Sequence, residues 1–291
     1  MANNIRDVRN RITSTKKTAQ ITKAMHMVSA SKLKGAERAI KEYRPFIDKA
    51  YEIILNIASS SENLSHPLLE EREVKRTCYV VVSSDRGLAG AFNANVLKEL
   101  TSILQKHQSA DEYVVLPLGL KAYTYCKKNK YELLTDHPIQ LRDDIEFNEV
   151  YNFTHNLVVN FLSHYIDEVH VIYNHFVNTL VQNPVCTKVF PINKNDLIEN
   201  AKQTKIYDFE GGVQEVLNVV LPIYIENYIY GLILDSKASE HAARMNSMKN
   251  ATDNAEEVIS SLGLLYNRAR QAAITSELTD IVGGASVINE N

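Results

Sequence analysis

The segment Ser83–Asn93, "SSDRGLAGAFN", is the part of the chain that most resembles a site for chemistry. It lies between an expected strand and an expected helix, which is where phosphate-binding loops occur. Gly87 and Gly90 could free backbone amides, and Arg86 could hold an anion. The segment nevertheless matches neither GxGxxG nor GxxxxGK[ST], and Asp85 would repel an anion. We therefore interpret it as a tight strand-to-helix turn.

Histidine and cysteine give no stronger candidate. The nine histidines include no HExxH or HxH pattern. The three cysteines, Cys78, Cys126 and Cys186, lie far apart without CxxC spacing, so neither a metal site nor a disulfide framework is indicated. No nucleophile has a neighbouring base that the sequence reveals. We therefore predict no catalytic residue, no metal site and no cofactor in this chain, and a reducing compartment.

Charge is distributed unevenly along the chain. The first 34 residues contain eight Lys or Arg against one acidic residue, Asp7, although the whole chain has a net charge of −3. Such a segment should face an acidic partner, which could be nucleic acid, anionic lipid or an acidic protein surface. A solvated helix face would carry the same charge, so charge alone does not decide between these interpretations.

The helix that must carry these charges runs from about Asn3 to Ser59. Alternating steps of three and four from Ile5 give sixteen positions, of which twelve are apolar. This repeat predicts a coiled coil, about 80 Å long for about 55 residues. Pro45 is expected to bend the helix or open it locally. The predicted seam consists of Ile5, Val8, Ile12, Thr15, Ala19, Thr22, His26, Ser29, Leu33, Ala36, Ile40, Tyr43, Ile47, Ala50, Ile54 and Ile57.

A second apolar set accompanies the most polar part of this seam, between Thr15 and Ser29. Its members are Ile21, Ala24, Met25, Met27 and Val28. The apolar stripe is therefore broadest in the middle of the basic segment. A helix that is apolar on several sides is expected to be surrounded by other protein.

The middle of the chain changes its period. β-Branched runs such as "TCYVVVSS" and "EYVVLPLG" alternate with amphipathic helical segments, which predicts a mostly parallel sheet covered by helices. Helical spacing returns from about Val213 to Ile288, and Gly283–Gly284 is a natural stop. The predicted seam of this last helix is Ala238, His241, Met245, Met248, Thr252, Ala255, Ile259, Leu262, Tyr266, Ala269 and Ala273.

These elements predict an α/β fold class: a long antiparallel coiled coil of the N- and C-terminal helices plus a central Rossmann-like α/β domain. The expected divisions are an N-terminal helix at 1–59, a linker at 60–75, a separate α/β domain at 76–209 and a C-terminal helix at 210–291. The apolar stripe of each terminal helix is too narrow for that helix to be stable alone. The two helices are therefore expected to pair with each other. No apolar run approaches the 18 residues of a membrane span.

Two other functions fit part of this pattern. A DNA-binding coiled-coil protein would bind the phosphate backbone along the basic helix. That helix lacks interleaved aromatic residues, however, and its apolar face would remain exposed to water. A nucleotide-dependent α/β enzyme with helical arms would need a better loop than Ser83–Asn93. Native isolation separates the cases, because a DNA binder copurifies with nucleic acid and an enzyme turns over alone.

Several long motifs resemble the gamma subunits of F-type ATP synthases, and the resemblance covers nearly the whole chain in order. They are "QITKAMHMVSASKL" (Gln20–Leu33), "SDRGLAGAFN", "ASEHAARMNSMKNATDNA" (Ala238–Ala255) and "YNRARQAAITSELTDIVGGA" (Tyr266–Ala285). The last contains the pattern Ile274-Thr275-x-Glu277-x-x-Asp280-x-x-x-Gly284-Ala285. After it, the family ends in small apolar residues, whereas this chain has "SVINEN".

The resemblance implies the central stalk, or rotor, of a proton-translocating complex. The coiled coil would penetrate the ring of alpha and beta subunits, where ATP is made or hydrolysed, so this chain would be a non-catalytic subunit of the enzyme. The partners implied are the alpha and beta subunits, the epsilon subunit and the membrane c-ring, with one copy per complex and no nucleic acid. The location implied is the cytoplasmic face of the bacterial plasma membrane, as a peripheral subunit. The residues expected to contact beta subunits are Lys16, Lys23, Met25, Arg270, Gln271, Thr275 and Glu277.

Overall fold

A computed structural model describes residues 2–60, 65–143, 145, 147–193, 197 and 212–289 of the chain. The chain forms two compact units, each of which contains part of both terminal helices. Unit 1 combines Met1–Val28 with Met245–Asn291, and unit 2 is Ser29–Arg244. The four-part division of the chain expected from the sequence stays a prediction.

Both terminal helices are formed. Helix α1 spans Ala2–Ser60 and helix α6 spans Val213–Asn289. Pro45 and Pro222 lie inside these helices, and both helices continue past them. The bend or local opening expected at Pro45 stays a prediction. The stop predicted at Gly283–Gly284 is wrong, because α6 continues to Asn289. Glycine disfavours a helix interior by only about 1 kcal/mol relative to alanine, which does not force a helix to end.

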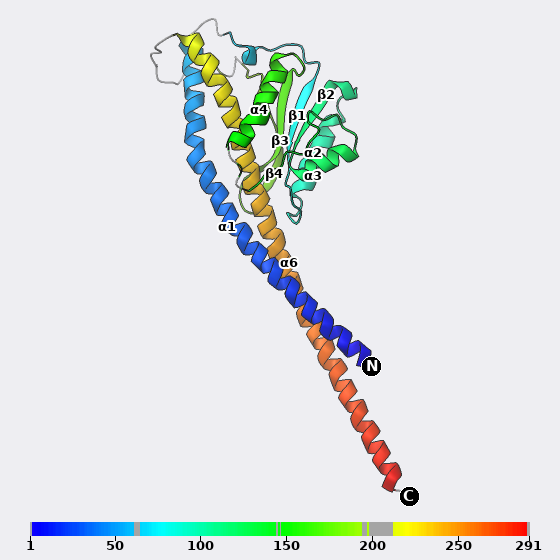
Figure 1. Cartoon of the computed structure of the whole chain (residues 1–291). Helices are drawn as coiled ribbons and strands as arrows, with labels where there is room; N and C mark the ends of the chain where they lie inside the picture. The colour runs from blue at the N-terminus through cyan, green and yellow to red at the C-terminus, as the bar shows by residue number, and fades with distance from the viewer. Residues whose placement is uncertain are drawn as a thin grey trace. The chain divides into compact units, whose positions relative to one another are not determined.

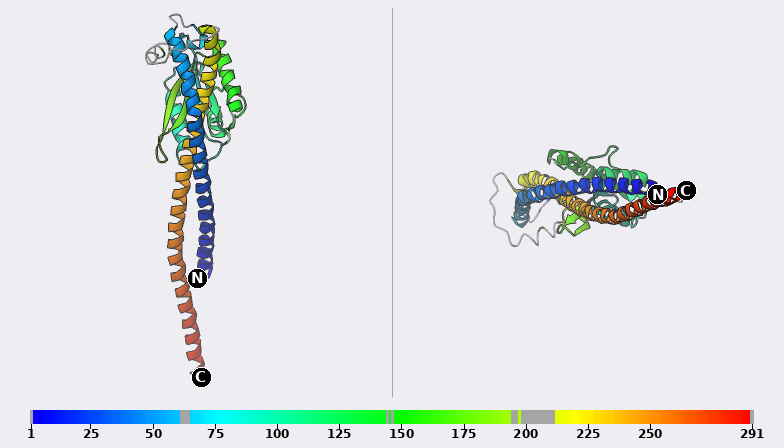
Figure 2. Two further views of the ribbon diagram at one scale, coloured as in Figure 1. Left: turned by 90° about the vertical axis from the view of Figure 1, so that its left-hand side faces the viewer. Right: turned by 90° about the horizontal axis from the view of Figure 1, so that it is seen from below.

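Within unit 1, the two helices run side by side along the predicted seam (Figure 1 and Figure 2). The hydroxyls of Thr22 and Thr252 lie 2.7 Å apart in a buried hydrogen bond. Met248 and Ala255, which flank Thr252 on the seam, are also buried. Every described seam position of unit 1 is buried or half-buried, whereas most residues between them are exposed. The helix pair predicted from the spacing is therefore confirmed here.

Within unit 2, aromatic contacts give the direction of the pair. The ring of Tyr43 lies 4.8 Å from that of Tyr230, and the ring of Tyr51 lies 5.6 Å from that of Tyr224. As α1 advances by eight residues, its partner on α6 recedes by six, so the helices are antiparallel. At Gly231 a Cβ atom would lie only 2.8 Å from the side chain of Ile47, so the helices approach closely at this position.

A four-stranded sheet forms the rest of unit 2. Its strands are β1 (Thr77–Val82), β2 (Tyr113–Leu118), β3 (Glu168–Phe176) and β4 (Gln182–Phe190), in the order β2-β1-β3-β4. β1 pairs in parallel with β2 and β3, while β3 and β4 are antiparallel. Along the outer edge of β2, isolated bridges join Val115 to Leu133 and Leu118 to Ile139. The mostly parallel sheet predicted from the sequence is confirmed.

Helices cover both faces of this sheet, which explains why all of β1 is buried. Helices α2 (Phe92–Leu104) and α3 (Leu120–Lys128) pack on the face that carries Tyr79 and Val81. Helix α4 (Phe147–Leu162) packs on the other face, which carries Cys78, Val80 and Val82. Two short 3-10 helices, Pro67–Leu69 and Ala110–Glu112, lie in the connections.

The hydrophobic core on the α4 face of the sheet is not formed by the α/β segment alone. It also contains Ile54–Ala58 of α1 and Leu217–Ile233 of α6, several of them without any exposed surface. The end of α1 and the beginning of α6 are thus covering helices of the sheet as well as partners of each other. The reason is hydrophobic: helix α4 covers only part of this apolar sheet face, and burying the remainder favours the fold.

Helix α6 is also the one helix among the described residues that is long and apolar enough to cross a membrane, by length and composition. Part of its most apolar 18-residue stretch is buried inside the protein. The buried core helix of a water-soluble protein passes the same test. Leu217, Leu221 and Ile225 are fully buried in the core of unit 2, so we assign the apolarity of α6 to that core.

Candidate partner-binding surface

The Ser83–Asn93 segment is a turn whose polar groups bind one another, as the sequence interpretation proposed. Asn93 Oδ1 accepts a hydrogen bond from the Ser84 amide at 3.0 Å, which ties the end of β1 to the start of α2. Asp85 accepts from the Leu120 amide at 2.9 Å and so caps α3. Gly90 has a φ of 56°, a left-handed conformation that suits glycine.

The neighbouring turn shows how closely the ends of β1 and β2 approach each other. A Cβ atom on Gly119 would lie 2.3 Å from the carbonyl oxygen of Ser83, and the φ of Gly119 is 90°. Ser83 itself is buried and its hydroxyl accepts from the Ala122 amide at 2.8 Å. The ends of β1 and β2 are therefore packed against each other, backbone to backbone, where a phosphate site would otherwise open.

Metal chemistry finds no assembled site in the part of the chain that the structure describes. No group of three or more His, Cys, Asp or Glu side chains there is arranged to hold a metal ion. All three cysteines are free thiols. Burial raises the pKa of Cys78 and of Cys126 to about 12, so neither side chain is a ready thiolate at neutral pH.

The charged groups that the structure does assemble form a network in unit 2. Lys237 is buried on α6, and its Nζ donates to Glu240 Oε2 at 3.1 Å and to the Leu141 carbonyl. Glu240 Oε1 in turn accepts from Arg244 Nη2 at 2.8 Å. Arg244 also lies 3.4 Å from the carbonyl oxygen of Arg86, so the network links α6 to the Ser83–Asn93 turn.

Asp143 joins α1 to the same network. It forms an ion pair with Lys32 of α1, and its Oδ1 lies 3.5 Å from His241 Nε2 and 3.9 Å from Lys237 Nζ. Burial opposes ionisation of Asp143, but the hydrogen bond from Lys32 and the charges of His241 and Lys237 lower its pKa. Burial lowers the pKa of His241, although Glu240 and Asp143 act in the opposite direction. The network therefore joins α1, α6 and the connection that contains Asp143 around the carboxylate of Asp143.

The surface of unit 1 is built differently. Lys16 and Lys23 are exposed and Met25 is half-buried on α1, while Arg270 and Glu277 are exposed on α6. Within the described residues, no ion pair involves a side chain of unit 1. Thr275 and Gln271 are also exposed, and the Thr275 hydroxyl donates to the Gln271 carbonyl at 3.0 Å. The seven residues expected to contact a partner thus lie in one unit, and six of them are exposed.

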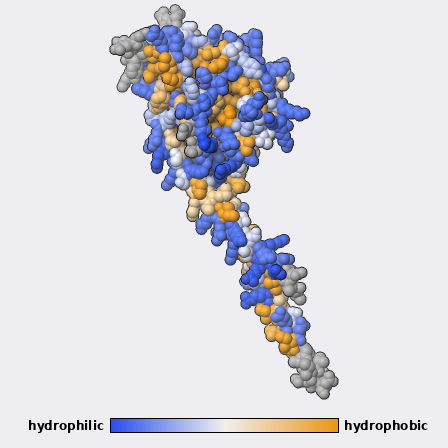
Figure 3. Space-filling view, in the orientation of Figure 1, coloured by the Kyte–Doolittle hydropathy of each residue, from blue (hydrophilic) through white to orange (hydrophobic). Residues whose placement is uncertain are grey.

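Large apolar side chains are exposed beside these charges. On α1, Ile21, Met27 and Val28 expose 61%, 59% and 54% of their surface. On α6, the corresponding residues are Val258, Leu264, Leu265, Ile274, Leu278, Ile281 and Val282. Figure 3 shows hydrophobic residues interrupting the hydrophilic surface along this part of the chain. Larger exposed apolar patches rimmed by polar residues are typical of surfaces that bind other protein, a membrane or a ligand.

Sequence reasoning predicted a partner-binding surface in unit 1, which stays a prediction, and it missed the network in unit 2. His241 was assigned to the helix seam, where it is buried, but its role beside Asp143 was not recognised. Lys237, which precedes the first seam residue Ala238, offered a signal, because a lysine next to an apolar seam needs a buried partner. Asp143 itself lies in a connection about 100 residues away in sequence and gave no such signal.

The chain is similar to characterised proteins in its amino-acid sequence and in its fold. The protein family described as ATP synthase matches residues 4–288. The ATP synthase gamma chain of Staphylococcus haemolyticus (strain JCSC1435) is 44% identical over 285 residues, which are 98% of this chain and 99% of that relative.

Solved structures agree on the fold. A chain of the Tetrahymena thermophila mitochondrial ATP synthase central stalk and c-ring is 25% identical, with a TM-score of 0.58 over 79% of this chain and 99% of that one. A chain of the Euglena gracilis mitochondrial ATP synthase in rotational state 3 gives a TM-score of 0.70 at 18% identity, over 99% of this chain and 95% of that one. The latter likeness concerns the fold alone.

Proposed function

The chain belongs to the ATP synthase family as one of its gamma chains, and on that premise we propose how its surfaces perform the work of a central stalk. As a gamma chain it is the rotor that couples rotation of the membrane c-ring to ATP synthesis or hydrolysis in the ring of alpha and beta subunits. Rotation changes nucleotide affinity only if the rotor has a different contact energy with each state of the ring. The question is therefore which side chains make those contacts.

One observation carries the proposal. On the same two helices, outside the seam that holds them together, unit 1 exposes apolar side chains and charges that form no ion pair among the described residues. A helix pair intended for water alone would gain nothing from exposing Ile21, Met27 and Leu264. The arrangement is that of a surface completed by other subunits.

On α1, we assign the basic stretch Lys16–Lys34 as a bearing surface that faces acidic loops of the beta subunits, although Lys32 in this stretch belongs to unit 2 and is already paired with Asp143. Lys16 and Lys23 supply charge, while Met25 lies beside them half-buried. Each exposed ion pair contributes only about 0–1 kcal/mol. Many weak contacts of this kind can be exchanged as the rotor turns, which a few strong contacts would prevent.

On α6, we assign Arg270, Gln271, Thr275 and Glu277 to contacts with the beta-subunit loops that grip the rotor. Arg270 can form a bidentate, charge-assisted pair with a carboxylate, and the exposed polar groups around it can donate or accept hydrogen bonds. Such contacts are worth a few kcal/mol at most when desolvated. They would transmit the resistance of the nucleotide sites to the rotor.

The remaining assignments are consistent with this role. We propose that unit 2 contacts the epsilon subunit and the c-ring, that each complex contains one copy of the chain, and that the complex lies at the cytoplasmic face of a bacterial plasma membrane. The chain would act as a non-catalytic subunit of the proton-transporting enzyme, since Ser83–Asn93 matches no phosphate-binding loop pattern. The isolated chain should accordingly bind neither ATP nor nucleic acid tightly.

Met25→Lys tests the bearing assignment. It would place a long charged side chain on the face that the ring encloses, and a strong pair with a beta carboxylate would hold one rotor orientation too tightly. The complex should assemble, yet ATP hydrolysis should drive proton pumping poorly. Both activities are measured in membranes that carry Met25→Lys and, as the matched control, Lys16→Ala. Coupling equal to wild type in Met25→Lys, or a larger defect in Lys16→Ala, would reject the assignment.

A further inference from the structure

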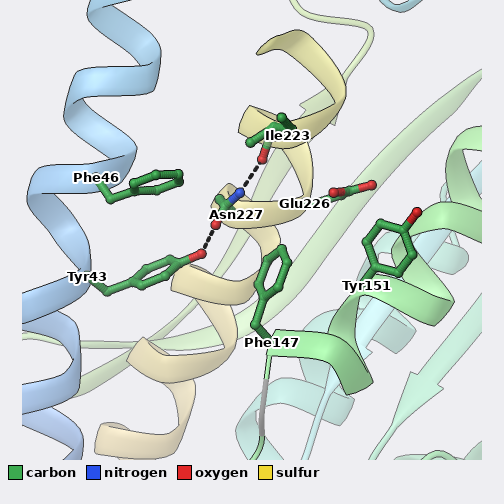
Figure 4. Close-up of a pocket in the computed structure, with 7 residues that line it drawn as sticks. All are labelled: Tyr43, Phe46, Phe147, Tyr151, Ile223, Glu226 and Asn227. Carbon is green, nitrogen blue, oxygen red and sulfur yellow. Dashed lines mark hydrogen bonds between the residues drawn. The ribbon is translucent and has the colours of Figure 1, made fainter. Parts of the chain in front are cut away.

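Unit 2 has an aromatic groove between α1, α4 and α6 (Figure 4). Its surface is almost entirely apolar. The side chain of Asn227 is already satisfied there, because its oxygen accepts from the Tyr43 hydroxyl and its amide donates to the Ile223 carbonyl. The groove therefore offers a ligand no polar or charged partner. The side chains of unit 2 that could react with another molecule lie on the sheet.

Cys186 is an accessible thiol with a base beside it. It is exposed on the outer strand β4, whereas Cys78 and Cys126 are buried. In the antiparallel register Cys186 lies opposite Ile172 of β3, so it shares a face of the sheet with His170, two residues earlier on β3. Its Sγ is 3.8 Å from His170 Nδ1, a distance at which a thiol can donate a hydrogen bond to an imidazole.

Glu168 orients this imidazole. Its Oε2 lies 3.0 Å from His170 Nε2, and its Oε1 accepts from Lys188 Nζ at 2.8 Å. Burial opposes ionisation of Glu168, but the hydrogen bonds from Lys188 and His170 lower its pKa. The ionised carboxylate can only accept, so it favours the imidazole proton on Nε2 and leaves the Nδ1 lone pair for the thiol. Thiol, imidazole and carboxylate thus follow one another in the order that activates a nucleophile.

The thiol depends on this base. Burial raises the pKa of Cys186 to about 11, with the charge of Glu99 acting in the same direction and that of Lys106 against it. Tyr79 of β1 also faces the thiol, and burial raises the pKa of this phenol to about 12, so it is neutral. Very little thiolate therefore forms near pH 7 by ionisation alone. Reaction at that pH requires transfer of the thiol proton to His170.

We propose that Cys186 is a site of reversible thiolation by small disulfides, with His170 as its general base and Glu168 as the residue that positions this base. The sulfur of Cys186 attacks one sulfur of the disulfide while its proton moves to His170 Nδ1. A new S–S bond to the protein forms as the old S–S bond breaks, and the departing thiolate takes the proton from His170. A second small thiol reverses the exchange. The site belongs to unit 2, so it is independent of the contacts assigned to unit 1.

The test follows modification of the full-length chain by hydroxyethyl disulfide, a small uncharged reagent, with intact-protein mass spectrometry and peptide mapping. The first measurement is the pH dependence of the wild-type rate. A thiol that reacts only through its own ionisation reacts about tenfold faster for each pH unit below its pKa. A thiol whose proton passes to a histidine reacts at a rate that levels off once the histidine is neutral, and histidines titrate between about pH 5 and pH 8.

We expect modification of Cys186 alone, at a rate that rises less than about threefold between about pH 8 and pH 9. Cys186→Ser should remain unmodified, because the other two cysteines are buried. A rise of about tenfold over the same interval would overturn the proposal, since the thiol would then ionise without help. Absence of modification by millimolar reagent, or modification of Cys78 or Cys126 in place of Cys186, would overturn it as well.

Variants then identify the base. His170→Gln should slow modification near pH 8 about tenfold or more and make the rate rise about tenfold per pH unit. Glu168→Gln should slow it about threefold and keep the levelled pH profile, because the base is still present but less well oriented. His155→Gln, at an exposed histidine of α4 on the opposite face of the sheet, should react as wild type. Equal rates in His170→Gln and wild type would overturn the assignment, and the wild-type pH profile decides it even where His170→Gln fails to fold.

Discussion

Helix α6 carries charges through both units, and the two units use them differently. In unit 2, Lys237, Glu240 and Arg244 are buried or half-buried and bound to one another at 2.8 and 3.1 Å. In unit 1, Arg270 and Glu277 are exposed, and the described residues offer neither of them an ion pair. The charges of α6 described here are thus paired in unit 2, whereas those in unit 1 form no ion pair among the described residues.

Charged side chains can therefore serve two purposes within one helix. A buried pair has lost its water, so its partners must stay together for the fold to stay intact. An exposed unpaired charge costs the isolated chain almost nothing, and it remains available for another molecule. Substitutions in unit 2 should therefore act on stability, whereas substitutions in unit 1 should act on the assembled complex.

The largest effect is expected at Lys237. Lys237→Ala leaves the Leu141 carbonyl and one oxygen of Glu240 without a donor in a buried site, so the free energy of unfolding should fall by about 3 kcal/mol. Urea unfolding of the isolated chain measures it. Lys249→Ala, at an exposed lysine of the same helix in unit 1, should stay within about 0.5 kcal/mol of wild type. Similar losses in both variants would remove the distinction between the units.

Arg270→Ala should show the opposite pattern. Its contribution to unfolding of the isolated chain should be no more than about 0.5 kcal/mol, because the side chain is exposed and unpaired. In the assembled complex, ATP synthesis and hydrolysis should slow several-fold through looser rotation, with nucleotide binding to the ring unchanged. A variant that assembles normally and retains full rates of both reactions would show that Arg270 does not grip the ring.

A smaller effect is expected at the hydroxyl pair in the seam of unit 1. Thr22→Val removes the partner of Thr252 at 2.7 Å and should cost about 1 kcal/mol of unfolding free energy. The double variant Thr22→Val with Thr252→Val should lose less than the sum of the single variants, because no hydroxyl is then left facing an apolar neighbour. Strict additivity in urea unfolding would mean that the two hydroxyls do not interact.

The smallest effect is a pH dependence of the unit 2 network. Burial lowers the pKa of His241 in the fold, against the charges of Glu240 and Asp143 and together with those of Lys237 and Arg244. Above the unfolded pKa of about 6.5 both states are neutral, so His241 has no effect there. As the pH falls from that value through the folded pKa, the unfolded chain binds the proton first and stability is lost.

His241→Gln isolates this contribution from the other histidines. The unfolding free energy of the variant should decline less than that of wild type when the pH is lowered from about 7 to about 5. The comparison between the two proteins cancels titration elsewhere in the chain. An equal or steeper decline in the variant would show that His241 is not held neutral by its burial.

Much of the fold follows from periodicity alone. The steps of three and four from Ile5 identify a seam whose described positions are all buried or half-buried, and the β-branched runs identify all four strands. The exposed second set at Ile21 and Met27 could also be predicted, because it lies outside the seam. Periodicity reports the faces of single elements, which is the information that these features need.

Periodicity could not reveal groups that meet only through the tertiary fold. Asp143 and Lys32, for example, are 111 residues apart. The shared core of Ile54–Ala58 and Leu217–Ile233 with the sheet was missed for a related reason. A helix seam was taken to face one partner, whereas these stretches face both a helix and a sheet. The roles assigned to the seven residues of unit 1 stay predictions.

The edges of the sheet have a consequence for the chain before it meets any partner. An open strand edge can recruit another strand and start aggregation. The outer edge of β2 is covered by the bridges to Leu133 and Ile139. The other outer strand, β4, contains Pro184, which has no backbone N–H to offer, and Lys188, whose side chain is exposed. The outer strands β2 and β4 of a newly synthesised subunit are therefore poor sites for pairing with another chain. The exposed apolar side chains of its helices remain accessible for assembly.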